Sequence, residues 1–246
     1  MYKSLKTALK TILPRHFLFK NELAFRSVYY LFYKGKKHSC TVCSKSLKSF
    51  IRLESNDTLC PSCGSLPRGR RLHQLLHAEF IKDGIHYLDF SPSRNLYRVF
   101  KANTKIHYVS TDYTDAFLAD KQYDITNLDI ADNTFNLITC YHILEHIEDD
   151  KKAMSELYRV LKPNGYCIIQ TPFKDGDIYE DLSITTETER LKHFGQEDHV
   201  RIYSVAGLQS RLEQTGFKVD VKTYTEQPDN YYGFDEYETI LVCTKA

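Results

Sequence analysis

The sequence predicts an α/β fold built on an open, mostly parallel sheet, because one segment reads as a strand, a helix and a second strand. Phe135 to Cys140 is a short apolar run rich in β-forming residues, as expected of a buried strand. Asp149-Asp150 signals a helix start, and Lys162-Pro-Asn-Gly165 ends that helix. Tyr166 to Thr171 is again mostly apolar or β-branched. Such right-handed strand–helix–strand units build parallel sheets, which bind ligands at the carboxyl ends of their strands.

The remaining elements follow from hydrophobic periodicity in chain order. A helix is predicted from about Pro67 to Lys82, because its apolar residues recur at helical spacing: Leu72, Leu75, Leu76 and Phe80. Arginines at 68, 70 and 71 crowd its first turn, where the helix dipole disfavours cations. They are therefore either ligands of an anion or a solvated face. Further strands are predicted near 86–90, 106–111 and 122–125, with a final antiparallel pair near 217–224 and 237–244.

Length and composition point to a protein that is made and kept in the cytoplasm. The 246 residues suffice for one full domain and a small module, and 42% hydrophobic residues allow a sizeable core. The sequence contains no uncharged apolar run near the roughly 20 residues of a membrane-spanning helix. At the amino terminus, Lys10 and Pro14-Arg15-His16 interrupt any apolar core of a signal peptide.

Residues 1–37 form a basic amphipathic amino-terminal arm. They carry nine Lys or Arg against Glu22 alone, a net charge of +8, whereas the remaining residues sum to −7. Large apolar residues, including Val28-Tyr-Tyr-Leu-Phe-Tyr33, are mixed with these cations. The pattern suits peripheral contact with an anionic membrane, at its inner face, or a grip on nucleic acid. The alternative is that the aromatic residues pack on the rest of the protein while the lysines face water.

Cysteine spacing predicts a structural zinc site over residues 38–65. The pairs Cys40-x-x-Cys43 and Cys60-x-x-Cys63 have the spacing of a zinc ribbon, in which four thiolates surround one Zn²⁺. Disulfides are the alternative, and no secretory signal favours them. The other cysteines, Cys140, Cys167 and Cys243, lie in predicted strands and are expected in the core rather than as nucleophiles.

Three segments of the chain together resemble the class I S-adenosylmethionine-dependent methyltransferases, in particular those of the type-11 kind. They are the turn Asp132-Asn-Thr-Phe-Asn136, the segment His142-Ile-Leu-Glu-His146 and the turn Leu161-Lys-Pro-Asn-Gly165. The resemblance implies that residues 66–246 form a Rossmann-like domain with a seven-stranded, mostly parallel sheet whose last strand is antiparallel. It also implies S-adenosylmethionine as the cofactor.

The resemblance also implies where that cofactor would bind. Asp89 matches the acidic position that ends the first strand, but Ser91 and Ser93 stand where the family has glycines. Asp112, after the second strand, matches the residue that accepts the ribose hydroxyls, and Asp124-Ile125 the pair that meets the adenine. Cys140, at the end of the fourth strand, completes the predicted set. For each aspartate alone, a turn or capping role is the alternative.

Three histidines are candidates for the general base of methyl transfer. His142 and His146 follow the fourth strand, and His199 belongs to a polar segment, Phe194 to Tyr203, in which Asp198 would orient it and Arg201 clamp an anion. A salt-bridged surface hairpin is the alternative for that segment. His142-x-x-Glu145-His146 also has the spacing of a zinc-peptidase helix, but its strand-before context and the lack of an obvious third ligand disfavour that function.

The sequence thus favours a cytoplasmic methyltransferase that modifies a hydroxyl, or less well an amine, of a sugar or other small polar metabolite. The alternative within enzymes is an RNA methyltransferase in which the ribbon and arm hold nucleic acid. The overall acidity of the chain beyond the arm makes nucleic acid the weaker partner. The alternative outside enzymes is a non-catalytic zinc-binding scaffold, because the cofactor loop lacks glycine.

Overall fold

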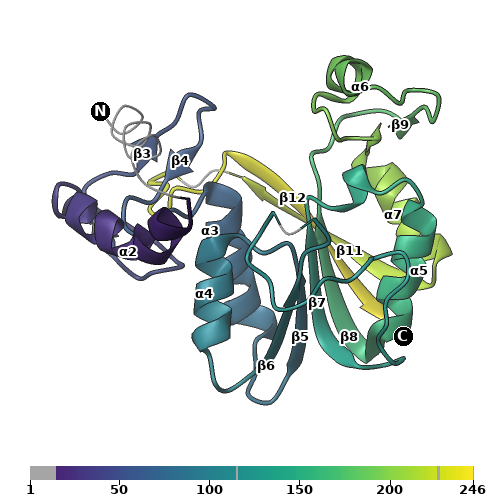
Figure 1. The fold of residues 1–246 in the computed structure, drawn as a ribbon, viewed down its shortest axis with the longest axis horizontal. Helices are drawn as coiled ribbons and strands as arrows, with labels where there is room; N and C mark the ends of the chain where they lie inside the picture. Colours follow the sequence, from purple (N-terminus) through teal and green to yellow (C-terminus); the bar gives the residue numbers. More distant parts are fainter. Residues whose placement is uncertain (1–14, 115, 226–227, 246) are drawn as a thin grey trace. The chain divides into compact units, whose positions relative to one another are not determined.

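The computed structural model describes residues 15–114, 116–225 and 228–245, which fall into two compact units (Figure 1). The first unit holds the residues up to Gln74 together with residues 228–236. The second holds Leu75–Thr225 and the residues from Tyr237 onward. Residues 1–14 of the predicted basic arm lie outside the described residues. Among the described helices, none has the length and apolarity needed to cross a membrane.

The first unit combines a helix, two small hairpins and the beginning of a second helix. β1 pairs with β2 and β3 with β4, both antiparallel. Cys40 and Cys43 lie between β1 and β2, and Cys60 and Cys63 directly follow β4. Its elements are α2 (Arg15–Leu31), β1 (Lys34–Ser39), β2 (Ser46–Leu47), β3 (Ile51–Arg52), β4 (Thr58–Leu59) and most of α3 (Pro67–Leu75).

Arg70 lies at the centre of this first unit and is completely buried. Its guanidinium donates to the carbonyl oxygens of Ser65 at 2.7 Å, Thr58 at 3.0 Å and Tyr232 at 2.7 Å. It also donates to the carbonyl of Gly233 and lies over the ring of Phe50, 4.2 Å from its centroid. Because Arg70 is buried and its donors are used in this way, it is neither a ligand of an anion nor part of a solvated face, the two alternatives that the sequence left open. Arg71 likewise covers the ring of Phe234, whereas Arg68 is exposed.

The second unit is built on a six-stranded sheet with the order β11-β12-β8-β7-β5-β6 (Figure 1). β6, β5, β7 and β8 are parallel, and β12 runs antiparallel between β8 and β11. The predicted α/β class, the parallel sheet and the antiparallel last strand are therefore confirmed. The strands are β5 (His86–Phe90), β6 (His107–Thr111), β7 (Phe135–Tyr141), β8 (Leu161–Gln170), β11 (Phe217–Thr225) and β12 (Tyr237–Lys245).

Helices cover both faces of this sheet, because alternate strand residues are apolar on both sides. α4 (Arg94–Ala102) lies on one face, and α5 (Asp150–Val160) and α7 (Val205–Gln214) lie on the other (Figure 1). The core under α5 and α7 joins Leu157 and Leu208 to strand residues such as Ile138 and Ile169. The smaller elements are η1 (Leu76–Phe80), η2 (Leu144–His146), β9 (Tyr179–Glu180), α6 (Glu187–Phe194) and β10 (Arg201–Ile202).

Two local expectations need correction. Residues 122–125 form no strand, because the backbone there is held by side chains: the amide of Tyr123 donates to Oγ1 of Thr111, and Asp124 accepts from Thr126. The sheet consequently has six strands rather than seven in the described residues. The helix α5 ends at Val160, and the turn at 162–165 is a bulge within β8, since Phe135 pairs with Leu161 and Leu137 with Tyr166. Asp149 caps α5 as expected, accepting from the amide of Lys152 at 3.0 Å.

Candidate functional site

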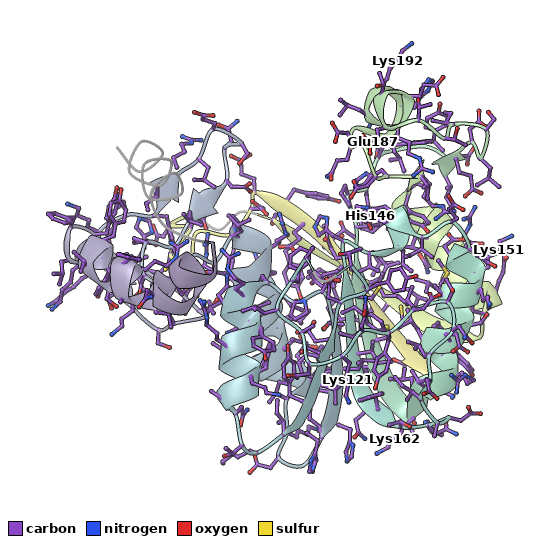
Figure 2. The ribbon with its side chains drawn as sticks, viewed as in Figure 1. Lys121, His146, Lys151, Lys162, Glu187 and Lys192 are labelled. Atoms are coloured by element: carbon purple, nitrogen blue, oxygen red, sulfur yellow. The ribbon has the colours of Figure 1, made fainter. Side chains whose placement is uncertain are left out.

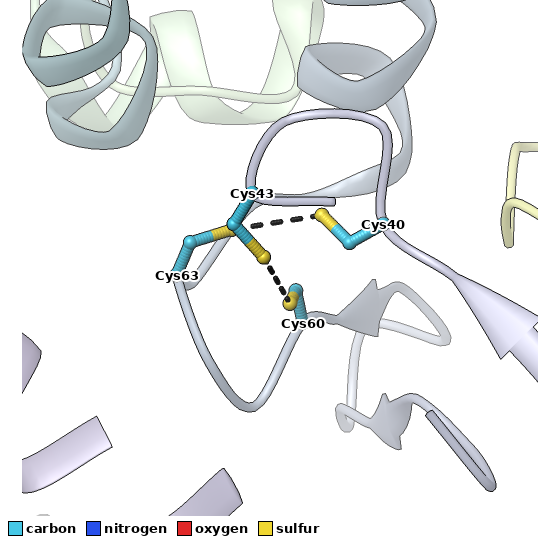
Figure 3. Close-up of side chains that lie close together, drawn as sticks. All are labelled: Cys40, Cys43, Cys60 and Cys63. Atoms are coloured by element: carbon cyan, nitrogen blue, oxygen red, sulfur yellow. Dashed lines mark hydrogen bonds between the residues drawn. The ribbon is translucent and has the colours of Figure 1, made fainter. Parts of the chain in front are cut away.

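The four cysteines of the first unit converge on one point (Figure 3). The Sγ atoms of Cys40 and Cys63 are 3.7 Å apart, and those of Cys43 and Cys60 are 3.8 Å apart. Both separations are far beyond the roughly 2.05 Å of a disulfide. Sulfur atoms about 2.3 Å from a tetrahedral Zn²⁺ would be roughly 3.8 Å apart, so the donor set fits zinc.

The two cysteine turns have the same backbone design. The amide of Ser44 donates to the carbonyl of Cys40, and the amide of Gly64 donates to the carbonyl of Cys60, at 2.8 and 2.9 Å. Ser44 and Gly64 both have positive φ, 55° and 79°. This left-handed conformation is easy for glycine and turns the chain back after each Cys-x-x-Cys pair. Each turn thereby points its two sulfur atoms inward.

In the second unit, polar residues gather where β5, β6 and β7 end. These strands are neighbours and parallel, so their carboxyl ends lie along one edge of the sheet. Ser91 follows β5, Asp112 follows β6 and His142 follows β7. The structure thus brings Ser91 and Asp112 together: the hydroxyl of Ser91 donates to Oδ1 of Asp112 at 2.6 Å.

Ser91 keeps the backbone shape that a glycine would adopt at this turn. Its φ is 45°, in the left-handed region that costs an L-residue other than glycine about 1–2 kcal/mol. Its amide donates to the carbonyl of Thr111, which ties the loop to β6. Ser93, the N-cap residue of α4, has an ordinary φ of −60°, and its hydroxyl donates to the side chain of Asn95 in the first turn of that helix. The strand–turn–helix arrangement is therefore retained without glycine.

Asp112 is buried and already well satisfied within the chain. Its Oδ2 accepts from the amides of Ala116 at 2.7 Å and Phe117 at 3.2 Å, while Oδ1 accepts from Ser91. The hydroxyl of Thr114 also donates to Oδ2, at 3.3 Å, so the about four acceptor sites of the carboxylate are all used and an external hydroxyl would have to replace one of these donors. The same contacts show that Ser91 occupies one of the positions from which an external hydroxyl could approach.

Asp89 lies inside the sheet rather than at its edge. Its carboxylate accepts from Oγ1 of Thr139 at 2.5 Å and from the phenol of Tyr108 at 2.9 Å, and only 3% of the residue is exposed. Burial raises the pKa of Asp89 to about 6 despite these hydrogen bonds. The partners Thr139 and Tyr108 were not singled out in the sequence, because cross-strand neighbours cannot be recognised before the strand order is known.

The other predicted cofactor residues lie in different surroundings. Asp124 is exposed and accepts from both the amide and the hydroxyl of Thr126. This is the turn role that the sequence offered as the alternative to cofactor binding. These hydrogen bonds lower the pKa of Asp124. The side chains of Ile125 and Cys140 lie in the hydrophobic core, so only their backbone atoms are available to a ligand. Burial raises the pKa of the Cys140 thiol, which agrees with a core role.

The three candidate histidines gather around one buried carboxylate, that of Glu145. Nδ1 of His142 lies 3.3 Å from Oε1 of Glu145, and the rings of His146 and His199 meet edge to face with centroids 4.6 Å apart. Burial opposes ionisation of Glu145, but the contact with His142 outweighs it, and the pKa of Glu145 is lowered. The pKa of His199 is also lowered, in this case by burial. His146, labelled in Figure 2, lies beyond β7, whereas Lys162 lies at the other end of the sheet, where β8 begins.

The segment between β7 and α5 is not a peptidase helix. His142 has a positive φ of 55°, and only Leu144–His146 form a short 3₁₀ turn. His142 and His146 therefore do not share one helical face. The structure does bring a residue from far along the chain, His199, to this cluster, which the sequence could not reveal.

Arg201 contacts groups of the chain itself, rather than being left free to clamp a bound anion. It is 1% exposed and donates to the carbonyl oxygens of Leu144 at 3.1 Å and Glu148 at 2.8 Å, as well as to that of Ile147. Its Nε lies 3.0 Å from Glu180. Because it binds carbonyls of residues on both sides of Glu145 and His146, Arg201 fixes the segment that carries these two residues. Asp198 was expected to orient His199, but the histidine that it contacts is His146, at 3.2 Å.

A cavity of about 720 Å³, with many charged residues in its lining, adjoins this segment in the second unit. Glu148, Asp149 and Lys151 line one part of it, directly after His146, and Arg190 and Asp181 line another. The lining carries charges of both signs and few large apolar side chains.

Comparison with known proteins identifies where similarity is concentrated. Residues 67–221 match the family described as a methyltransferase domain. A protein of Methanocaldococcus jannaschii, MJ0638, is 33% identical over 85 residues, which cover 33% of this chain and 37% of that protein. Demethylmenaquinone methyltransferase of Bacteroides fragilis is 46% identical over 46 residues, 19% of each chain. The matched segments thus span well under half of the length of these relatives.

Solved structures show the same fold at low identity. A methyltransferase of Haloferax volcanii, solved with the Trm112 methyltransferase activator, superposes with a TM-score of 0.51 at 12% identity, covering 73% of this chain and 91% of that one. Phosphoethanolamine N-methyltransferase 2 of Haemonchus contortus, in complex with S-adenosyl-L-methionine, gives 0.50 at 16% identity, covering 72% and 52%. The cyclase SpnF also gives 0.50 at 16% identity, covering 72% and 81%. The fold is therefore shared by enzymes that carry out different reactions.

Proposed function

Because the chain belongs to the methyltransferase domain family, we propose that it transfers the methyl group of S-adenosylmethionine to a hydroxyl of a small polar acceptor such as a sugar. One observation carries this proposal: Ser91, Asp112 and His142 follow three neighbouring parallel strands at a single edge of the sheet. Open α/β sheets bind ligands at this edge. Asp112 would accept the ribose hydroxyls, and the turn at Ser91 would approach the methionine part of the cofactor.

In the proposed reaction, the acceptor oxygen attacks the methyl carbon of the sulfonium. The new bond joins oxygen to methyl, and the electron pair of the broken sulfur–carbon bond stays on sulfur, which leaves a neutral thioether. His142 takes the hydroxyl proton, and Glu145, 3.3 Å from its Nδ1, orients the ring. The protein mainly has to hold the oxygen in line with the methyl group at about 3–3.5 Å.

A small polar acceptor is supported by the cavity beside this segment. Charged side chains, among them Lys151, Asp181 and Arg190, line it. An extended hydrocarbon placed there would cover these charged side chains and remove them from water, which is unfavourable.

The test is calorimetric titration of the zinc-containing protein with S-adenosylmethionine, repeated on Asp112→Ala and on Asp124→Ala. We expect micromolar binding that Asp112→Ala abolishes, and a smaller loss for the exposed Asp124→Ala. If the unchanged protein fails to bind S-adenosylmethionine at millimolar concentration, the chain is a non-catalytic scaffold and not an enzyme. The Ser91–Asp112 hydrogen bond, which occupies the carboxylate, would then explain the lack of binding. If the protein methylates RNA but no small molecule, the acceptor is a nucleic acid and the proposed class of acceptor is wrong.

We also propose that Cys40, Cys43, Cys60 and Cys63 hold a structural zinc ion that stabilises the first unit. The spacing of their sulfur atoms supports it, and four thiolates leave no open position for chemistry. Cys60→Ser should lose about one zinc per chain and expose the first unit to proteolysis. Cys167→Ser, a buried cysteine of the sheet, serves as the matched control, and unchanged zinc content in Cys60→Ser would contradict the proposal.

The exposed apolar residues of the first unit support peripheral binding to an anionic membrane. Val28, Leu31 and Phe32 are 62–68% exposed at the end of α2, and exposed lysines follow at positions 34, 36 and 37. Leu31→Ser should reduce co-sedimentation with vesicles that contain phosphatidylglycerol. Leu182→Ser, equally exposed but in the second unit, should not. Equal binding to vesicles of phosphatidylcholine alone would argue against the electrostatic part of this proposal.

A further inference from the structure

We propose that Glu145, His146 and His199 bind a divalent transition-metal ion, a second metal site besides the four cysteines. Each of the three residues offers one ligand atom, and these atoms all lie within 4.8 Å of one another. Ligands about 2.0–2.2 Å from a tetrahedral zinc are roughly 3.4 Å apart, so small side-chain rotations would close the set. Two imidazoles and one carboxylate are a common ligand set for Zn²⁺ and other first-row ions.

The buried polar atoms of this cluster lack partners that a cation would supply. Glu145 is 1% exposed and His199 is 4% exposed. Both carboxylate oxygens of Glu145 and Nε2 of His199 are buried without a hydrogen bond. Leaving such groups unpaired is unfavourable, and native proteins rarely do so without a bound ion or water. The contact of Glu145 with His142 reaches ion-pair distance but not hydrogen-bond geometry.

The surroundings of the cluster hold its histidines in the way that metal ligands are usually held. Nδ1 of His146 lies 3.2 Å from a carboxylate oxygen of Asp198, which leaves Nε2 free to bind. His199 hydrogen-bonds the backbone of Phe194, and its Nε2 is the nitrogen without a partner. A carboxylate or carbonyl on the second ring nitrogen fixes the tautomer and the ring orientation of a metal-bound histidine.

The backbone also joins the two segments that contribute ligands. The amide of Val200 donates to the carbonyl of Glu145 at 2.9 Å. Arg201 donates to the carbonyls of Leu144 and Glu148 on either side of Glu145 and His146. The cluster therefore has a fixed geometry although its residues come from distant parts of the sequence. A metal site needs ligands whose positions are held by the surrounding structure in this way.

Three protein ligands leave one coordination position open, which is typical of catalytic rather than structural sites. The charged cavity begins at Glu148, two residues after His146. An acceptor hydroxyl bound to the open position would become more acidic and would be held in place. This role rests on the proposed methyl transfer, whereas metal binding itself does not. His146 and His199 would then be ligands, and His142 would be the histidine left to accept the proton.

The experiment counts zinc in the full-length protein after equilibration with excess Zn²⁺ and removal of free metal. We expect about two zinc ions per chain, and about one in His146→Gln, His199→Asn and Glu145→Gln, with the one at the cysteines retained. His146 is half-buried, so His146→Gln tests the site even if the variants at the buried positions fold poorly. His193→Gln, on the exposed part of α6, is the matched control and should keep about two.

A Co²⁺ titration of the protein with zinc in the cysteine site gives an independent readout. Cobalt bound at the new site should show visible d–d absorption without the sulfur-to-cobalt band that thiolate ligands produce. One zinc per chain in the unchanged protein, or a second zinc that persists in His146→Gln and His199→Asn, would overturn the proposal. Calorimetry with S-adenosylmethionine on the same samples separates the two failures. If the protein binds the cofactor but no second metal ion, only this inference is wrong. If it binds a second metal ion but no cofactor, only the proposed function is wrong.

Discussion

The hydroxyl of Ser91 donates a 2.6 Å hydrogen bond to Oδ1 of Asp112, across the ends of two neighbouring parallel strands. Ser91 adopts a left-handed backbone conformation to do so. The contact joins the glycine-free loop to the carboxylate proposed to hold the ribose. A substitution in the loop at Ser91 should therefore also change the hydrogen bonding of the Asp112 carboxylate.

Ser91→Gly should strengthen binding of S-adenosylmethionine by several-fold, up to about tenfold, since about 1.4 kcal/mol is a factor of ten. Glycine tolerates the positive φ, and its lack of a hydroxyl frees Oδ1 of Asp112 for the cofactor. Calorimetry measures the effect, and Ser93→Gly is the control because Ser93 has an ordinary φ and contacts Asn95. Weaker binding in Ser91→Gly would mean that the hydroxyl preorganises Asp112 instead of competing with its ligand.

Asp89 should make stability depend on pH in mildly acidic solution. Burial raises its folded pKa from 3.8 to about 6, so between these values the folded protein holds a proton that the unfolded chain releases. The contribution of this group to the free energy of unfolding is therefore greatest below pH 4 and falls as the pH rises through about 6. The total change is of the order of 3 kcal/mol, at 1.36 kcal/mol per pKa unit.

Asp89→Asn removes this titration and should flatten the dependence over that range. Urea unfolding of both proteins between pH 4 and 7 measures it. An Asp89→Asn variant whose stability still falls over that range, as steeply as that of the unchanged protein, would show that another group is responsible.

Arg201→Met should destabilise the second unit by about 3–5 kcal/mol, the usual cost of removing one partner from a buried ion pair. The carbonyls of Leu144, Ile147 and Glu148 would lose their shared donor, and Glu180 would lose one of its two arginines. Denaturant unfolding checks this prediction. Arg190→Met is the control, because the hydrogen bonds of Arg190 within the described residues are two long ones of 3.4 Å. A loss of stability equal to that of Arg201→Met would refute the distinction.

Arg70→Lys should loosen the first unit although it keeps the charge. A lysine cannot reproduce the planar fork that reaches the carbonyls of Thr58, Ser65 and Tyr232 at once. We expect faster loss of zinc from the cysteine site to a chelator, by tenfold or more, on the basis of about 1.4 kcal/mol per factor of ten. Arg68→Lys, at an exposed position of the same helix, should release zinc at the original rate. Equal rates in both variants would show that Arg70 does not support the site.

Local sequence signals predicted most elements of the second unit. The apolar runs at 86–90 and 135–140 became β5 and β7, the cap at Asp149 begins α5, and the last two strands pair antiparallel as expected. These features depend on periodicity and capping within a few residues, which the sequence contains directly. The expected strand at 122–125 was wrong because hydrogen bonds to side chains, rather than a strand ladder, hold that backbone.

By itself, the sequence determined the α/β class, the four-cysteine spacing and the identity of the polar residues that follow the strands. Only the tertiary structure decided that His199 joins Glu145 and His146, that Arg70 and Arg201 are buried donors to carbonyl groups, and that residues 228–236 belong with the cysteine turns. The physical reason is sequence separation. Periodicity reports which face of an element is apolar, but contacts between distant segments depend on strand order and loop closure, which no local pattern records.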